Sequence, residues 1–287
     1  MLSCIASLLV AVASAAPPAP SFTVTLPLTA SSSVLGRARV YLSNRCGKDD
    51  PPPRAQCKDD QDSSQVFAVD TPEAGLQPGK HVGIDLHAAG YPRHTIQDVP
   101  AGAYCAQAEL FKYQRYARGD GENLTLPVSC VSDAGGDGAY ASPVGTLFSD
   151  VLEVIVEPGG IVGPVDLPLT HVVKPVASPG CSGKGADTKW IKTVRVNSKL
   201  LSDFWGQRME LAACVLLPFG FDTHPTAKYP LLVAHGHYSA VFTPGGRFDD
   251  SPPSNQSGYE YVDQLYAYYL YRNWTSATGP SVAHARW

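Results

Sequence analysis

The stretch Lys228-Tyr229-Pro230-Leu231-Leu232-Val233-Ala234-His235-Gly236-His237-Tyr238 decides how we interpret the rest of the chain. Pro230 ends the segment before it, and the run Leu231–Ala234 has no polar face, which is the pattern of a strand buried on both sides of a sheet. Gly236 follows, and a glycine there allows a sharp turn and a close approach of the backbone to a ligand. Two interpretations are open: a ligand-binding turn, and an ordinary buried strand that ends in a turn.

Two further strands are predicted before this stretch. Residues 190–197 alternate apolar and polar side chains, and residues 209–217 form a largely apolar run that Pro218 ends. Between them, residues 198–206 are rich in aromatic side chains, and we expect a loop. After the stretch, about twenty residues of Pro, Gly, Ser and Asp predict a long loop.

A helix is predicted after that loop, over residues 259–272. Val262, Leu265, Tyr266 and Tyr269 recur at helical spacing, which predicts an amphipathic helix with these side chains on its buried face. Two strands, a central buried strand and a helix together predict an α/β sheet.

The first half of the chain is expected to contain strands only. Short runs between residues 22 and 169 alternate apolar and polar side chains, as in Phe22, Val24, Leu26 and Leu28, and turn residues separate them. This pattern predicts an antiparallel β-sandwich over residues 20–173. Residues 44–64 are expected to form an exposed, disulfide-tied loop, and its acidic cluster lacks the spacing of a calcium site. A linker rich in Pro, Gly and Ser is predicted over residues 174–188.

The N-terminus has the features of a secretory signal peptide, predicted over residues 1–16. Residues 4–12 are apolar, and Ala13-Ser14-Ala15 is a small-x-small cleavage pattern, although no Lys or Arg precedes the apolar core. A short membrane anchor is the alternative. The net charge of −4 and the absence of basic runs exclude nucleic acid as an expected partner, and after cleavage no membrane is expected either. We expect no metal and no cofactor.

Secretion agrees with the number of cysteines, because six of them follow the predicted signal peptide: Cys46, Cys57, Cys105, Cys130, Cys181 and Cys214. Six cysteines can pair in 15 ways, and we expect neighbours to pair, as Cys46–Cys57, Cys105–Cys130 and Cys181–Cys214. Three sequons place candidate N-glycans on Asn123, Asn255 and Asn273.

Several motifs, taken as a set, resemble the secreted esterases related to enterochelin esterase. They are Pro100-Ala101-Gly102-Ala103-Tyr104 with Ala106-Gln107-Ala108, Arg118-Gly119-Asp120-Gly121 with Leu124-Thr125-Leu126-Pro127, the segment 142–149, the segment 200–206 with 213–218, and the line from His224-Pro225 and Tyr229-Pro230 to His235-Gly236-His237. The resemblance covers roughly residues 22–276. It implies an N-terminal all-β sandwich followed by a partial α/β-hydrolase (α/β) domain over residues 189–287.

The same resemblance gives the loop after the central strand a role. In α/β-hydrolases this loop supplies a backbone N–H to the oxyanion hole, which implies that role for the loop His235, Gly236, His237 and Tyr238. Two solvent-facing or hydrogen-bonded imidazoles in an ordinary turn are the alternative for His235 and His237.

The nucleophile that such an enzyme needs is missing from this sequence. No Gly-x-Ser-x-Gly occurs, and the nearest segment, Gly279-Pro280-Ser281-Val282-Ala283, lacks the second glycine and the residues for a following helix. No residue is therefore predicted to be catalytic, and His284 has no expected partner. We expect a chain truncated before the nucleophile.

The predicted function is that of a secreted, esterase-like acyl hydrolase family member that is inactive as this chain. A small-molecule ester would be its substrate only in a complete domain. The alternative is a non-enzymatic secreted β-sandwich binding module. A further expectation is that the sheet is cut after three strands, which leaves Leu231–Ala234 as an open apolar edge.

Overall fold

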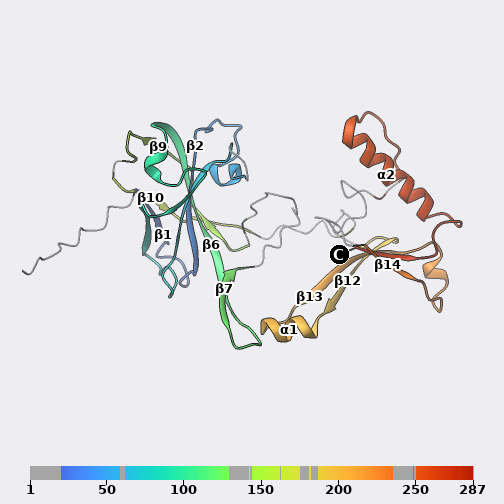
Figure 1. The fold of residues 1–287 in the computed structure, drawn as a ribbon. Coiled ribbons are helices and arrows are strands. Elements are labelled where there is room, and N and C mark those ends of the chain that lie inside the picture. The colour runs from blue at the N-terminus through green and yellow to red at the C-terminus, as the bar shows by residue number, and fades with distance from the viewer. Residues whose placement is uncertain are drawn as a thin grey trace, which may run out of the picture. The chain divides into compact units, whose positions relative to one another are not determined.

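The computed structural model describes residues 21–58, 62–128, 142, 144–161, 163–174, 181, 187–234, 248 and 250–286 (Figure 1). Within these residues the protein is mostly β, with antiparallel and mixed sheets and two α-helices, and no clear α/β-hydrolase domain is evident. The chain divides into two compact units. We call residues 1–110 with 148–171 the first unit, and residues 111–147 with 172–287 the second unit.

Fifteen strands, two α-helices and three short 3-10 helices make up the described secondary structure. In chain order they are β1 (Phe22–Thr25), β2 (Gly36–Ser43), η1 (Pro53–Gln56), β3 (Gln65–Asp70), β4 (His81–Ile84), β5 (Ala89–Tyr91), η2 (Ile96–Asp98), β6 (Gly102–Ala117), β7 (Asn123–Pro127), β8 (Leu147–Phe148), β9 (Leu152–Val156), β10 (Val165–Pro168), β11 (His171–Val172), β12 (Ile191–Asn197), α1 (Lys199–Trp205), β13 (Glu210–Leu216), η3 (Phe221–Thr223), β14 (Leu231–Ala234), α2 (Gly258–Trp274) and β15 (Ala283–Arg286).

Two sheets are built from the predicted β half. A three-stranded sheet has the order β10-β1-β4, in which β1 is parallel to β10 and antiparallel to β4. A larger sheet has the order β11-β8-β6-β2-β3-β5, and β7 and β9 also pair with β6. Alternate side chains from both sheets are fully buried in the first unit, among them Phe22, Ile84, Val40, Phe67 and Leu110. The predicted alternation therefore supplies this core.

The sequence predicted one residue too many on the buried face of the first strand. Phe22, Val24 and Leu26 are fully buried, but Leu28 is 83% exposed. Strand β1 ends at Thr25, and Pro27, which has no backbone N–H, lies between the strand and Leu28. A period-2 pattern predicts a shared face only while the backbone stays extended.

The second unit contains a four-stranded mixed sheet of order β12-β13-β15-β14. Strands β12 and β13 form an antiparallel pair, β15 is antiparallel to β13, and β14 is parallel to β15. The sequence predicted three strands here, and the fourth, β15, was missed. Because β15 lies between β13 and β14, β14 is an edge strand, and Leu231, Leu232 and Val233 are 59%, 52% and 52% exposed. The prediction of a strand buried on both sides is therefore wrong in this structure.

Helix α2 occupies the predicted region but turns a different face inward. Val262, Tyr266 and Tyr269 are exposed, whereas Gln264, Ala267 and Trp274 are buried. Trp274 packs with Ile191, Cys214 and Leu216, and its indole N–H donates to the carbonyl oxygen of Leu217 at 2.9 Å. This docking contact fixes the rotation of the helix, and the periodicity within residues 259–272 could not reveal it because Trp274 lies outside that range.

The segment predicted as an aromatic-rich loop is the helix α1. Ser198 caps it by accepting a hydrogen bond from the backbone N–H of Leu201 at 3.3 Å, and Gly206 ends it with a φ of 64°. The helix contacts the β6–β7 hairpin: the N–H of Gly119 donates to the carbonyl oxygen of Phe204 at 2.7 Å, and the guanidinium of Arg118 lies 4.7 Å from the centroid of the Phe204 ring.

Two disulfides are formed among the described cysteines. Cys181–Cys214 confirms one predicted pair. The other is Cys46–Cys105, so the predicted pairs Cys46–Cys57 and Cys105–Cys130 are both wrong. Cys46 follows β2, Cys105 lies in β6, and β2 and β6 are neighbours in the sheet, which brings their Cα atoms to 5.8 Å. Cys57 is a free, half-buried thiol, and Cys130 lies outside the described residues.

Candidate functional site

The predicted oxyanion-hole loop, His235, Gly236, His237 and Tyr238, lies outside the described residues. The structure describes the elements that flank it, with β14 ending at Ala234 and α2 beginning at Gly258. The loop therefore leaves the carboxyl end of a strand that is parallel to its neighbour β15. In open α/β sheets this is the edge at which ligands bind.

Ser281 and His284 do not form a nucleophile elbow. An elbow places its serine after a strand and before a helix, but Ser281 is exposed and precedes β15, and His284 lies within that strand. The imidazole of His284 is near the indole of Trp274, with 6.0 Å between ring centroids. That this pair is not catalytic stays a prediction.

The other predicted positions are placed as follows. Asn123, Asn255 and Asn273 are all exposed, as glycan acceptors must be. Among the described residues no group of three or more His, Cys, Asp or Glu side chains could hold a metal ion. Residues 1–20, which include the predicted signal peptide, lie outside the described part of the chain, as do Asp59, Asp60 and Gln61.

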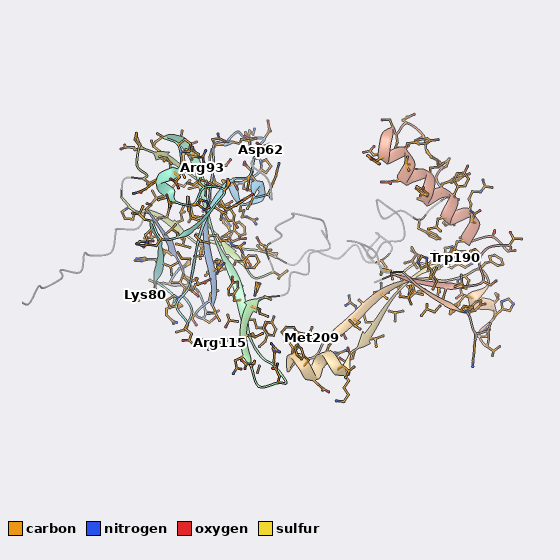
Figure 2. The ribbon with its side chains drawn as sticks, viewed as in Figure 1. Asp62, Lys80, Arg93, Arg115, Trp190 and Met209 are labelled. Atoms are coloured by element: carbon orange, nitrogen blue, oxygen red, sulfur yellow. A yellow bond between two sulfur atoms is a disulfide. The ribbon has the colours of Figure 1, made fainter. Side chains whose placement is uncertain are left out.

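The first unit contains a cavity that the sequence did not predict. We call it the polar cavity; its volume is about 370 Å³, and its lining includes Arg45, Lys58, Asp62, Ser64, Arg93 and Tyr104. Figure 2 shows Asp62 and Arg93 near one end of the first unit, whereas Lys80 lies toward the other end. The volume of the polar cavity lies at the lower end of the range for small-molecule sites.

Buried amide side chains hold two of the cationic residues in place. Gln65 accepts a hydrogen bond from the N–H of Arg93 at 2.8 Å and donates to the carbonyl oxygen of Arg93 at 2.9 Å. Gln56 accepts from the Nε–H of Arg45 at 3.1 Å and donates to the carbonyl oxygen of Arg45 at 3.1 Å. Burying an amide is costly unless it is hydrogen-bonded, so these bonds fix the backbone of Arg93 and both the carbonyl oxygen and the Nε–H of Arg45.

A second cavity of about 420 Å³ shares Asn44 and Tyr104 with the polar cavity. The hydroxyl of Tyr104 donates to the carbonyl oxygen of Pro100 at 3.0 Å, which fixes the ring at the wall common to both cavities. The lining residues come from the strands β2, β3 and β6 and from the segments that follow β2, η1, β5 and η2, so no single sequence motif predicts the cavity. The charges within residues 44–64, which we interpreted as a solvated loop, were its one signal in the sequence.

Cys57 is the other chemically distinct group of the first unit. Burial raises the pKa of its thiol above the ordinary value, and the hydroxyl of Ser63, 3.8 Å from the sulfur, opposes that shift. The thiol is therefore held protonated at neutral pH and is a poor nucleophile there.

No family model, curated protein or solved structure matches this chain. The two disulfides indicate an oxidising, extracellular type of compartment. Across the described residues, none of the helices has the length and apolar character needed to cross a bilayer.

Proposed function

We propose that the chain is a secreted, esterase-like member of the acyl hydrolases, with a β-sandwich first and the opening strands of an α/β-hydrolase sheet after it. The observation that carries the proposal is the connection β14–α2–β15. It joins two parallel, hydrogen-bonded strands through a helix, which is the building unit of α/β sheets.

The antiparallel hairpin β12–β13 at the other side of the sheet supports the same proposal. Together the four strands have the mixed pairing of a sheet that opens antiparallel and continues parallel. In such an enzyme a serine attacks the ester carbonyl, a histidine moves the proton, and backbone N–H groups stabilise the oxyanion. The loop 235–238 would supply an N–H group, and the sequence supplies no Gly-x-Ser-x-Gly.

Engineered cysteine pairs test the parallel pairing. Leu231 is in register with Ala283, so the pair Leu231→Cys and Ala283→Cys should cross-link under mild oxidation. The control pair Leu231→Cys and Arg286→Cys lies three residues out of register, roughly 10 Å along the strand, and should stay reduced. Peptide mapping reads out both pairs. Cross-linking of the control pair instead would indicate antiparallel strands and contradict the proposal.

We also propose that this 287-residue chain does not hydrolyse esters, and a turnover assay tests this claim. We expect the purified chain to cleave p-nitrophenyl acetate at the rate of its Ser281→Ala variant, and a fluorophosphonate probe to leave both unlabelled. Without an activated serine no tetrahedral intermediate forms. Serine-dependent turnover that Ser281→Ala abolishes would refute the claim.

A second candidate function is a binding module in the first unit, and the polar cavity favours it. Part-buried hydrogen bonds fix the backbone of Arg93 and the Nε–H of Arg45 in its lining, and ligand sites are usually preformed in this way. This candidate needs no nucleophile. It is tested by ligand binding that does not change when the loop 235–238 is replaced by glycine and serine.

A further inference from the structure

The polar cavity carries an excess of positive charge. Arg45, Lys58 and Arg93 line it, against the single carboxylate of Asp62. Among the described residues, no carboxylate lies within ion-pair distance of any of these three cations. The lining therefore has three positive charges and one negative charge, and an anion between the cations would relieve their mutual repulsion.

The hollow also contains a hydrogen-bonding group without a partner in the structure. Ser64 lines the polar cavity, is only 4% exposed, and its buried hydroxyl has no hydrogen-bond partner in the structure. A buried hydroxyl left unpaired costs free energy. Its backbone is fully engaged, since its N–H donates to Gln56 at 3.1 Å and its carbonyl oxygen accepts from Ser63 at 2.9 Å. The backbone of Ser64 is therefore fixed, and a ligand oxygen that reaches its buried hydroxyl would supply the missing partner.

The cations themselves are held in position through their backbones. The side chain of Gln65 bonds to the backbone N–H and carbonyl oxygen of Arg93, and that of Gln56 bonds to the carbonyl oxygen of Arg45. The N–H of Lys58 donates to the hydroxyl of Ser63 at 3.0 Å. The backbone at all three cations therefore loses little freedom on binding, and such preorganisation strengthens affinity. Tyr104 adds an aromatic ring at the wall shared with the second cavity.

We propose that the polar cavity binds an acidic saccharide, whose carboxylate or sulfate group lies between Arg45, Lys58 and Arg93. The hydroxyl of Ser64 bonds to an oxygen of the same ligand, and the sugar ring lies against Tyr104. Guanidinium groups bind oxyanions through paired N–H donors, and aromatic rings pack on the apolar faces of sugars. This inference rests on the second candidate function and is independent of the hydrolase-like sheet.

Calorimetry of the full chain with three matched probes tests the ligand class. Galacturonic acid carries a carboxylate, galactose 6-sulfate carries a sulfate, and galactose carries neither. We expect at least one acidic probe to bind roughly tenfold or more tightly than galactose, because hydrogen bonds to charged groups are the strong ones. Comparing the two acidic probes identifies which group the site prefers, and raising the salt concentration should weaken both.

Variants assign the binding to the polar cavity. Arg93→Gln and Lys58→Gln should each weaken the acidic probe by about tenfold, and the backbone bonds that hold both residues persist in the variants. Lys80→Gln removes the same charge toward the other end of the first unit and should change affinity by less than about twofold (Figure 2). Ser64→Ala should weaken binding without changing its salt dependence. Thermal unfolding of every variant checks that the fold is kept.

Three results would overturn the inference. One is equal affinity for galactose and the acidic probes, which would leave a binding module without an acidic ligand. The second is a loss in Lys80→Gln as large as in Arg93→Gln. The third is no binding of either acidic probe at millimolar concentration.

Discussion

Glu109 shows what a single buried charge requires of its surroundings. It is 1% exposed within β6, and the hydroxyl of Tyr41 donates to its carboxylate at 2.8 Å. Burial, and then the charge of Glu109, raise the pKa of Tyr41 above its ordinary value, so Tyr41 keeps its proton and remains a donor. In the sequence Glu109 was only a charge within a mixed run, because its partner Tyr41 is 68 residues away.

Removing that donor should destabilise the protein. We expect Tyr41→Phe to lower the free energy of unfolding by about 1–3 kcal/mol, because it leaves the buried carboxylate with one hydrogen bond fewer. Urea denaturation measures the loss. The matched control is Tyr104→Phe, whose hydroxyl bond to Pro100 is exposed and should contribute about 1 kcal/mol or less. Equal losses in the two variants would contradict this account of Glu109.

The thiol of Cys57 should react slowly at neutral pH. Its raised pKa means that a smaller fraction is thiolate at any given pH, so the pH midpoint for alkylation by iodoacetamide should lie above that of an exposed cysteine. Mass spectrometry of the Cys57 peptide gives the rate at each pH. Burial is the main cause of the raised pKa, so the alkylation midpoint should fall when the chain is unfolded in urea without reductant. A midpoint of the native protein at or below that of the unfolded protein would exclude burial as the cause.

At the scale of elements, α1 depends on how it meets the β6–β7 hairpin. Gly206 ends the helix at a φ of 64°, and a Cβ atom there would clash with the carbonyl oxygen of Ala117. Gly121, in the same hairpin, also has a positive φ, of 92°, but faces open space. Both glycines have a positive φ, which other residues rarely adopt, but only Gly206 is packed against a neighbouring atom.

This difference predicts unequal costs for the same substitution. Gly121→Ala should cost about 1–2 kcal/mol, the strain of a left-handed alanine. Gly206→Ala carries that strain and must also move α1 away from the hairpin, so its cost should be larger. Urea unfolding gives both values, and near-UV circular dichroism should change only in Gly206→Ala, because Trp205 packs on Tyr116 with ring centroids 5.8 Å apart. Equal costs would argue against close packing at Ala117.

The sequence predicted the elements that local patterns determine. The strands β12 and β13 and the helix α2 lie within two residues of their predicted bounds, because alternation and helical spacing are properties of the segment itself. Strand β15 was missed, since Ala283-His284-Ala285-Arg286 is short and weakly apolar and is held by two neighbours rather than by its own pattern.

Features that depend on distant neighbours were not predictable. The partner of Cys46 follows from the adjacency of β2 and β6, and the inward face of α2 follows from the docking of Trp274. The polar cavity is lined by residues of three strands and four connecting segments, and no spacing in the sequence predicts that these come together. The oxyanion-hole residues stay a prediction, because they lie outside the described part of the chain.

For the molecule as a whole, the edge strand β14 is an exposed apolar strand of the second unit's sheet. Among the described strands only β15 pairs with it, and its described side chains are more than half exposed. Apolar edge strands are liable to pair with other chains. The expectation that Leu231–Ala234 forms an open apolar edge therefore holds in the structure, in a sheet of four strands rather than three.

Hydrogen exchange should rank the strands of this sheet. We expect the amides of residues 231–234 to exchange faster than those of residues 214–216, which lie in β13 between two partners. The dye ANS should bind the full chain and should bind less when Leu232→Lys and Val233→Lys are introduced. Strong protection of residues 231–234 would mean that this edge is covered in solution.

The position of β15 within its sheet affects how the chain is made. It is the last of the four strands to leave the ribosome, yet it lies between β13 and β14. The hairpin of β12 and β13 can form early, but β14 has no place to dock until Arg286 has emerged. Throughout that interval the nascent polypeptide carries an unattached apolar segment, which is the kind of sequence that chaperones of the secretory route bind.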